Sequence, residues 1–244
     1  MSWPGVAEAV KAGATTVILP LGATEQHGPH LPLGTDTIRA AALADRLAEK
    51  LPGSLVAPAL PFGCSDEHSG FPGLLGLEAE TLARVILDLA RRLAGWGARR
   101  LVLLSAHGGN GEALDHALAL LRKELPDLVA WANGNLETIA PALLEVARRE
   151  DISPNVLGLH AGEGETSELL HLRPDLVSMH RCTPGFTGDM EDILDRLHAG
   201  GLKPVTTSGV LGDPTHAAAG RGSRYLNALA DDLAAALRDE ADGS

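Results

Sequence analysis

The sequence predicts an α/β fold, a three-layer α/β/α sandwich around a mainly parallel sheet. Short apolar runs rich in β-branched residues alternate with longer stretches in which apolar residues recur every three or four positions. This alternation is typical of a parallel sheet covered by helices on both faces. The chain has 244 residues, 45% of them hydrophobic, and no repeat or linker divides it. We therefore expect a single domain over residues 1–244.

Four strands and the helices between them follow from this pattern. The strand candidates are short, apolar and bounded by turn residues or charges, and they are Thr15–Leu21, Leu55–Leu60, Arg100–Ser105 and Leu128–Ala132. The clearest helix is Thr81–Leu93, whose apolar residues form one stripe. Other helices are expected over Thr37–Leu51, around Leu114–Leu121 and around Leu226–Leu237. Gly200–Pro214 is predicted to be an ordered loop, and Asp239–Ser244 a frayed tail.

Charge and composition argue against several classes of protein. The formal net charge is −12, with 32 acidic and 20 basic residues, whereas nucleic acids and anionic membranes attract clustered positive charge. Cys64 and Cys182 lie far apart and indicate neither a disulfide framework nor a thiolate zinc site. The sequence begins without a signal-peptide pattern, and no apolar run approaches the ~18 residues of a membrane span. We expect a cytoplasmic protein that binds neither nucleic acid nor membrane.

Acids and imidazoles collect directly after the first predicted strand. Residues 21–37, LGATEQHGPHLPLGTDT, contain no Lys or Arg. Glu25 and His27 are two positions apart, so an extended backbone projects both side chains to the same face. Asp36 comes just before the helix predicted to begin at Thr37, where it could also be an N-cap. Sites in parallel sheets form beyond the carboxyl ends of the strands, so we expect a site here.

Two further segments add polar residues. SAHGGNGEA follows the strand that ends at Ser105, and it offers His107, two glycines and Asn110 as a possible helix N-cap. A phosphate-binding turn is the alternative, but the G-x-G-x-x-G pattern and the P-loop lysine are both missing. The third segment, GLHAGEGETSELLHL, supplies His160, Glu163 and Glu165 before another helix. We expect all three segments to converge.

Taken together, these residues predict a metal site. Alone, Glu25 could be a solvated acid, and His107 could be a strand-end histidine bonded to backbone. Two imidazoles and three carboxylates nevertheless fall in converging loops with no nearby cation expected to neutralise them: Glu25, His27, Asp36, His107 and Glu165. Two divalent cations and one hydroxide would nearly balance their three negative charges. Oxygen and imidazole ligands without thiolate suit zinc, iron(II) or manganese.

Four segments together resemble the creatininase family of amidohydrolases: LPLGATEQHGPHLPLGTDT, SAHGGN, HAGEGETS and GVLGDPTHAAAGRG. The resemblance implies a binuclear metal centre and a homo-oligomer, with a hexamer-like assembly in the family. Carried over by position, Glu25, His27, Asp36 and His107 match family metal ligands, with Asp36 as the bridge. Creatininase has a ligating His-x-Glu at the third strand, whereas here Gly109 stands two residues after His107. Glu165 is therefore the candidate that completes the ligand set.

The resemblance also implies a reaction. HAGEGETSELLHLRP and GGLKPVTTSGVLGDP look most like segments of family peptidases that release a C-terminal Val-Tyr dipeptide from a modified precursor peptide in redox-cofactor biosynthesis. We expect metal-assisted amide hydrolysis in which His160 or Glu163 protonates the leaving nitrogen. His160 is preferred because an ordinary histidine pKa of ~6.5 suits proton exchange near neutrality. Two alternatives are a hydrolase of creatinine or another small amide, and a non-catalytic binding protein.

The surroundings of the site can also be anticipated. We expect His30 to orient a ligand carboxylate and His68 to line the substrate entrance. A peptidase needs an open cleft, and the Gly/Pro-rich segments Phe62–Gly76 and Gly200–Pro214 could form its walls. With aromatic residues at only 3% of the chain, a closed aromatic pocket for creatinine is less expected.

Overall fold

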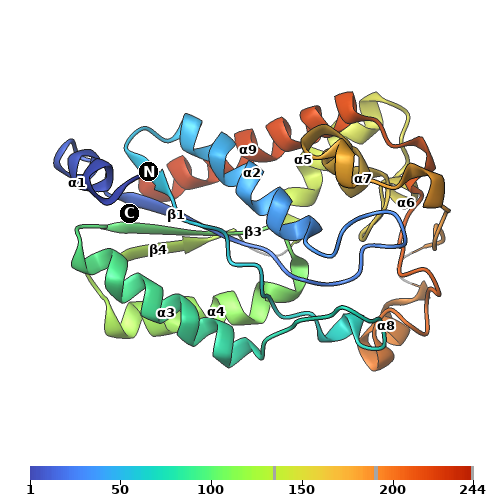
Figure 1. Ribbon diagram of the computed structural model, residues 1–244, viewed down its shortest axis with the longest axis horizontal. Coiled ribbons are helices and arrows are strands. Elements are labelled where there is room, and N and C mark those ends of the chain that lie inside the picture. Colours follow the sequence, from blue (N-terminus) through green and yellow to red (C-terminus); the bar gives the residue numbers. More distant parts are fainter. Residues whose placement is uncertain (134–135, 190–191, 243–244) are drawn as a thin grey trace.

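The computed structural model describes residues 1–133, 136–189 and 192–242, and these contain a four-stranded parallel sheet (Figure 1). Its strands are β1 (Thr16–Leu21), β2 (Ser54–Val56), β3 (Arg100–Ser105) and β4 (Val129–Ala132), in the order β2-β1-β3-β4. The central strands β1 and β3 pair along their whole length, from Thr16 opposite Arg100 to Leu21 opposite Ser105. The loops that follow these two strands therefore leave the sheet side by side.

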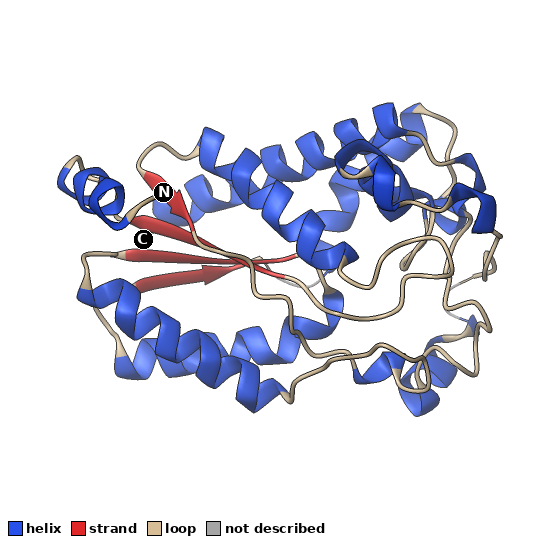
Figure 2. Ribbon diagram, in the orientation of Figure 1, coloured by secondary structure: helices blue, strands red, loops and turns tan. Residues whose placement is uncertain are grey.

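Helices cover both faces of the sheet (Figure 2). On one face, alternate β1 residues such as Val17 and Leu19 pack with α3 (Ala79–Gly95) and α4 (Gly111–Glu124). On the other, Ile18 packs with α2 (Thr35–Lys50) and α9 (Ala219–Asp242). Side chains alternate between the two faces of a strand, so each central strand contributes to both cores. The predicted three-layer α/β/α fold is confirmed.

The remaining helices lie around the ends of the sheet. At one end, Figure 1 shows α6 (Pro154–Leu157), α7 (Glu163–Leu172) and α8 (Leu194–Gly200), together with the loop that follows β1. α5 (Leu136–Arg149) and α7 both pack against α9. At the opposite end lies α1 (Trp3–Lys11), which has no fully buried residue. This helix was not predicted from the sequence. In the parts of the chain that the structure describes, no helix has the length and apolarity needed to cross a membrane.

Two predicted boundaries were wrong. The second strand ends at Val56 rather than Leu60, because an extra residue breaks the ladder: Ala57 N–H bonds to Ile18 O, but the next bond, to Pro20 O, comes from Leu60 rather than from Ala59. The N–H groups of Ala57 and Leu60 still bond to β1, so the segment stays beside the sheet. At the other end of the chain, α9 continues to Asp242 through most of the predicted frayed tail, while residues 243–244 lie outside the described part.

Candidate metal centre

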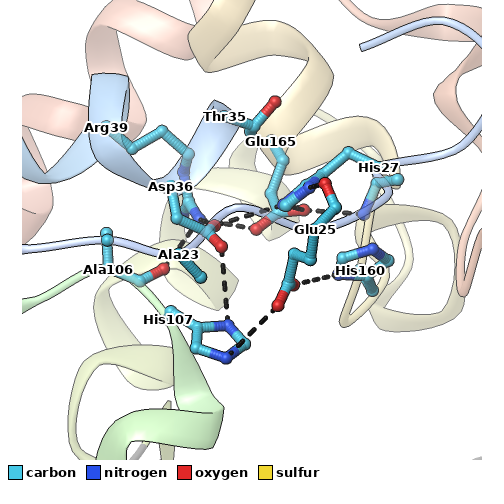
Figure 3. A network of polar contacts seen from close by, with 12 residues as sticks. Ala23, Glu25, His27, Thr35, Asp36, Arg39, Ala106, His107, His160 and Glu165 are labelled. Carbon is cyan, nitrogen blue, oxygen red and sulfur yellow. Dashed lines mark hydrogen bonds and ion pairs between the residues drawn. The ribbon is translucent and has the colours of Figure 1, made fainter. Parts of the chain in front are cut away.

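Four of the predicted ligand residues meet beyond the carboxyl ends of β1 and β3 (Figure 3). Glu25 and His27 come from the loop after β1, Asp36 from the first turn of α2, and His107 from the segment after β3; all are buried. Asp36 Oδ1 lies 3.2 Å from His27 Nε2, and Asp36 Oδ2 lies 3.5 Å from His107 Nδ1. One carboxylate thus stands between two imidazoles, where it could bridge two ions.

A glycine brings α2 close to the end of β1. A Cβ atom on Gly22 would lie 2.5 Å from Thr37 Cα, so no larger residue fits there without moving the helix. The helix also begins earlier than expected, with Gly34 as its N-cap residue. Asp36 is therefore not an N-cap, and its carboxylate is directed at the histidines instead.

The position of His107 is held by an amide side chain rather than by a helix cap. Asn110 Oδ1 accepts the N–H of Cys64 at 2.9 Å, and Asn110 Nδ2 donates to Gly22 O at 3.2 Å and to Ser105 Oγ at 3.1 Å. Ser105 Oγ in turn donates to His107 O at 2.9 Å. Asn110 makes no side-chain capping bond, so its role is to tie three loops together around His107.

The third predicted segment joins the cluster, although it does not follow a strand of the sheet. His160 forms an isolated bridge with Leu211, and its Nδ1 lies 3.8 Å from Glu25 Oε1. Glu165 Oε2 lies 3.8 Å from His27 Nε2. Between them, Ala161 adopts a left-handed φ of 50°, which is uncommon for residues other than glycine. Its N–H donates to Glu165 Oε2 at 2.6 Å, so this strained residue helps to orient the carboxylate.

The expectation that no cation neutralises the cluster was wrong. Arg39 is buried on α2, where its Nη1 lies 2.5 Å from Glu165 Oε1 and 3.5 Å from Asp36 Oδ1. Its Nε also donates to Glu168 Oε2 at 2.6 Å. Arg39 follows Asp36 by three residues, a spacing that places both side chains on one helix face. Both oxygens of Glu165 consequently accept a hydrogen bond from the protein.

Glu163 lies in a different network. Its carboxylate accepts hydrogen bonds from Tyr225 Oη at 2.7 Å, Arg221 Nε at 2.5 Å and Ser167 Oγ at 2.5 Å. These contacts tie α7 to α9, and Glu163 is fully buried within them. They give no support to Glu163 as the proton donor that the sequence left open beside His160.

His68 and Gln26 belong to the centre although sequence reasoning missed their roles. His68 is buried rather than at an entrance, and its Nε2 lies 3.0 Å from Glu25 Oε1. Gln26 Nε2 lies 3.0 Å from His68 Nδ1 and can only donate, so we infer that His68 carries its proton on Nε2, toward Glu25. His30, expected to orient a ligand carboxylate, contacts Thr166 Oγ1 at 2.9 Å instead.

The chemistry of the buried carboxylates fits a bound cation. Among the described residues, both oxygens of Glu25 and Oδ2 of Asp36 are buried without a hydrogen bond of good geometry. A buried carboxylate is costly unless it is paired, hydrogen-bonded or bound to a metal. Four sets of ligand atoms lie within 4.8 Å of one another: Glu25–His27–Asp36, Glu25–Glu67–His107, His27–His160–Glu165 and Glu25–His68–His160. Their oxygen and imidazole donors suit zinc, manganese or iron(II).

The protonation of the metal-free cluster follows from its burial. Burial raises the pKa of Glu25 to about 8, although the nearby His107 opposes this shift. Burial disfavours the charged form of His27, but Asp36 more than compensates and raises the pKa of His27 to about 9. Burial and the neighbouring His27 lower the pKa of His160 to about 4. Near neutral pH, the metal-free protein therefore holds a proton on Glu25 and a second one on His27, while His160 is neutral.

Metal binding is expected to release these protons and to tighten as the pH rises. Metal ligands must be deprotonated, and pH 7 lies below the pKa values of both Glu25 and His27. Each proton that an ion displaces should strengthen apparent binding about tenfold per pH unit, until the pH passes about 9. Mn²⁺ titration calorimetry in buffers of different ionisation enthalpy measures the protons released. A metal affinity that does not change with pH would remove Glu25 and His27 from the ligand set. The control is His116→Gln, on the exposed face of α4, which should leave the pH dependence of metal affinity unchanged.

Comparison with known proteins decides the family. The family model for creatininase, described as creatinine amidohydrolase, matches residues 1–237. The chain belongs to the creatininase family. It is 39% identical over 225 residues to the mycofactocin precursor peptide peptidase of Mycobacterium ulcerans (strain Agy99), covering 89% of this chain and 82% of the relative. It is 33% identical to the creatinine amidohydrolase of Pseudomonas putida, covering 98% and 95%.

The solved structures of this family have the same fold. A mutant creatininase of the Zn-Zn type superposes with a TM-score of 0.78 at 29% identity, covering 98% of this chain and 96% of that one. The family match includes all three segments that form the cluster. The buried Glu, Asp and His residues of the cluster thus all lie within the part of the chain that matches the creatininase family.

Proposed function

We propose that this creatininase-family chain is a metal-dependent peptidase that releases the C-terminal Val-Tyr dipeptide from the modified mycofactocin precursor peptide. It is a hydrolase that acts on C–N bonds. The observation that carries the proposal is the buried cluster, in which both oxygens of Glu25 and Oδ2 of Asp36 have no hydrogen bond of good geometry. Identity to a mycofactocin precursor peptide peptidase, 39% against 33% for a creatinine amidohydrolase, supports the peptide substrate.

The cluster is proposed to hold two divalent cations, of zinc, iron(II) or manganese. Asp36 would lie between them, with His27 and Glu165 on one side and Glu25 and His107 on the other. When bound, such ions polarise a substrate carbonyl and lower the pKa of a bound water. The protein keeps Glu25, His27, Asp36 and His107 buried, and Arg39 fixes the carboxylate of Glu165 in place.

His160 is proposed to carry the proton to the leaving nitrogen. Its Nε2 lies 2.7 Å from the carbonyl oxygen of Gln26, to which it can donate a hydrogen bond. The side-chain nitrogen of Gln26 lies 3.0 Å from the same Nε2, so Gln26 holds the ring in place, while Nδ1 faces Glu25. A neutral His160 can first accept a proton from the attacking water and then deliver it to the amine. Amide cleavage needs this delivery, because the amine must leave in its neutral form.

A cavity of about 710 Å³ opens beside the cluster and supports access by a peptide. Glu67 and Gly109 line its inner end, and Cys64 and Asp66 come from the predicted wall segment Phe62–Gly76. Clefts of ~300–1,000 Å³ are typical for ligands larger than creatinine. The other predicted wall, Gly200–Pro214, does not line this cavity, but it supports the first wall through a hydrogen bond from Leu202 N–H to Glu67 O at 2.8 Å.

The proposed function is tested on the modified precursor itself. We expect the metal-loaded protein to release a C-terminal dipeptide from the decarboxylated precursor peptide, detected by mass spectrometry, because the open cavity can accept a peptide end. The metal-free protein is the control and should release none. Creatinine should be hydrolysed no faster by the loaded protein than by this control. Rapid creatinine turnover with an untouched precursor would replace the peptidase with a small-amide hydrolase.

A further inference from the structure

We propose that Glu67 is an additional metal ligand, on the His107 side of the centre, in the space that Gly109 leaves open. This inference rests on the metal centre proposed above. Glu67 lies in η1 (Asp66–His68), a short 3-10 turn next to the buried His68. Sequence reasoning did not single it out, because the surrounding Gly/Pro-rich segment has no periodicity.

The Glu67 carboxylate approaches the cluster at distances that suit a shared ion. Its Oε1 lies 3.6 Å from His107 Nε2 and 3.9 Å from His68 Nε2, both too long for hydrogen bonds. Glu25 Oε2 lies 3.4 Å from the same His107 nitrogen, which also lies 2.7 Å from the carbonyl oxygen of Cys64; an ion at this position would replace that contact. Glu25, Glu67 and His107 thus offer three ligand atoms within 4.8 Å of one another, as a divalent cation between them requires.

Gly109 leaves the volume that the Glu67 carboxylate occupies. A Cβ atom on Gly109 would lie 2.6 Å from Glu67 Oε1 and 2.5 Å from His107 Nε2, and it would also clash with Cys64 O. Gly109 is not among the glycines with positive φ, so its backbone conformation does not require glycine. Steric crowding therefore explains why glycine stands here: any side chain at position 109 would displace the Glu67 carboxylate or His107.

The backbone around Glu67 is anchored from two sides. His68 N–H donates to Ser65 O at 3.0 Å within the turn, and Leu202 N–H donates to Glu67 O at 2.8 Å from the opposite loop. Gly201 allows this close approach, because a Cβ atom there would clash with Glu67 O. The carboxylate therefore starts from a fixed position beside the cluster, although 36% of the side chain remains exposed to the cavity.

The distribution of charge also favours a ligand on this side. Arg39 lies against Glu165, whose two oxygens already accept hydrogen bonds from Arg39 and from Ala161 N–H. Among the residues that the structure describes, no Arg or Lys forms an ion pair with Glu25 or Glu67, whose ion pairs are all to histidines. Once Glu25 has lost its proton, the carboxylates without an Arg or Lys partner are those of Glu25 and Glu67, and a cation between them would balance their charge.

The first test compares two variants, each of which replaces one carboxylate in the same cavity with a neutral amide. Glu67→Gln should lower the affinity for one of two Mn²⁺ or Zn²⁺ ions at least ~10-fold, the scale already typical of residues that only support a ligand. Glu112→Gln is the matched control, because Glu112 lines the same cavity with 74% of its side chain exposed. Affinity is measured by chelator competition and ion content by elemental analysis. Cobalt-substituted protein should show a changed visible absorption spectrum in Glu67→Gln only.

A second test moves the carboxylate. Glu67→Asp keeps the charge but shortens the side chain by one methylene group, so it should weaken binding of the same ion that Glu67→Gln affects. Unchanged affinity for both ions in Glu67→Gln would overturn the proposal, even if turnover fell. In that case Asp36→Asn should still lose metal, and the proposed centre would stand. If the unaltered protein binds neither ion tightly, the metal centre itself is wrong.

Discussion

Asp36→Asn is expected to lose most of both metal ions and to hydrolyse the precursor peptide no faster than the metal-free protein. The substitution keeps the size of the side chain but removes the one carboxylate whose two oxygens face His27 and His107, at 3.2 and 3.5 Å. A neutral amide cannot bridge two cations in the same way. Its loss should therefore disturb both ion positions together, whereas loss of a ligand on one side should affect one.

The measurement is elemental analysis of protein purified without chelator, alongside peptide turnover. The matched control is Asp45→Asn, which removes one carboxylate from the exposed face of the same helix and should retain about two ions per chain. Circular dichroism and thermal melting check that both variants are folded. If Asp36→Asn keeps its full metal content, Asp36 is not the bridge.

The fold could be predicted because its signals are periodic. Ile18 and Val102 face one helical layer while Leu19 and Leu103 face the other, so the central strands are apolar on both sides. Such continuous apolar runs indicate a parallel sheet with two covered faces. The second strand was predicted too long because apolar character continues beyond Val56, whereas an extra residue between Ala57 and Leu60 breaks the hydrogen-bond ladder to β1.

Site residues that directly follow a strand could be predicted from the sequence. Residues whose side-chain positions depend on helix geometry or on irregular loops were predicted less well. Arg39 was missed although three residues separate it from Asp36, one helical turn away. Glu163 and Glu165 were both placed at the site, as alternative proton donor and as metal ligand, yet two residues on a helix are ~200° apart, so only one of them can face the metal cluster. Glu165 faces His27, and Glu163 faces Tyr225.

Loop residues are hardest to place because no repeating pattern constrains them. Glu67 and His68 reach the cluster from a segment whose path depends on contacts distant in sequence, such as Asn110 with Cys64 N–H and Leu202 with Glu67 O. The sequence signal was weak: an adjacent acid and imidazole in a Gly/Pro-rich stretch after a strand. Such a pair is more often a solvated surface feature, and only the folded loop brings it to Glu25.

His160→Ala is expected to lower kcat for the precursor peptide by ~10²-fold or more while both ions remain bound, the usual scale for removing a positioned acid–base group. The ring is close enough to be a ligand, since its Nδ1 lies 3.8 Å from Glu25 Oε1. Its Nε2 instead contacts Gln26, at 2.7 Å from the backbone oxygen and 3.0 Å from the side-chain nitrogen, and these contacts orient a neutral imidazole toward the carboxylate cluster. This arrangement suits a group that accepts and returns a proton.

Two further variants separate this role from structure and from metal binding. His160→Asn retains a polar group that can reach Gln26 O, so it should fold normally and yet stay slow, because an amide cannot carry the proton. His180→Ala, at an exposed position in η4 (Met179–Arg181), should keep full activity. An unchanged rate in His160→Ala would assign proton transfer to another group, whereas loss of one ion together with activity would make His160 a ligand. The proposed role requires a slow enzyme with its metal content intact.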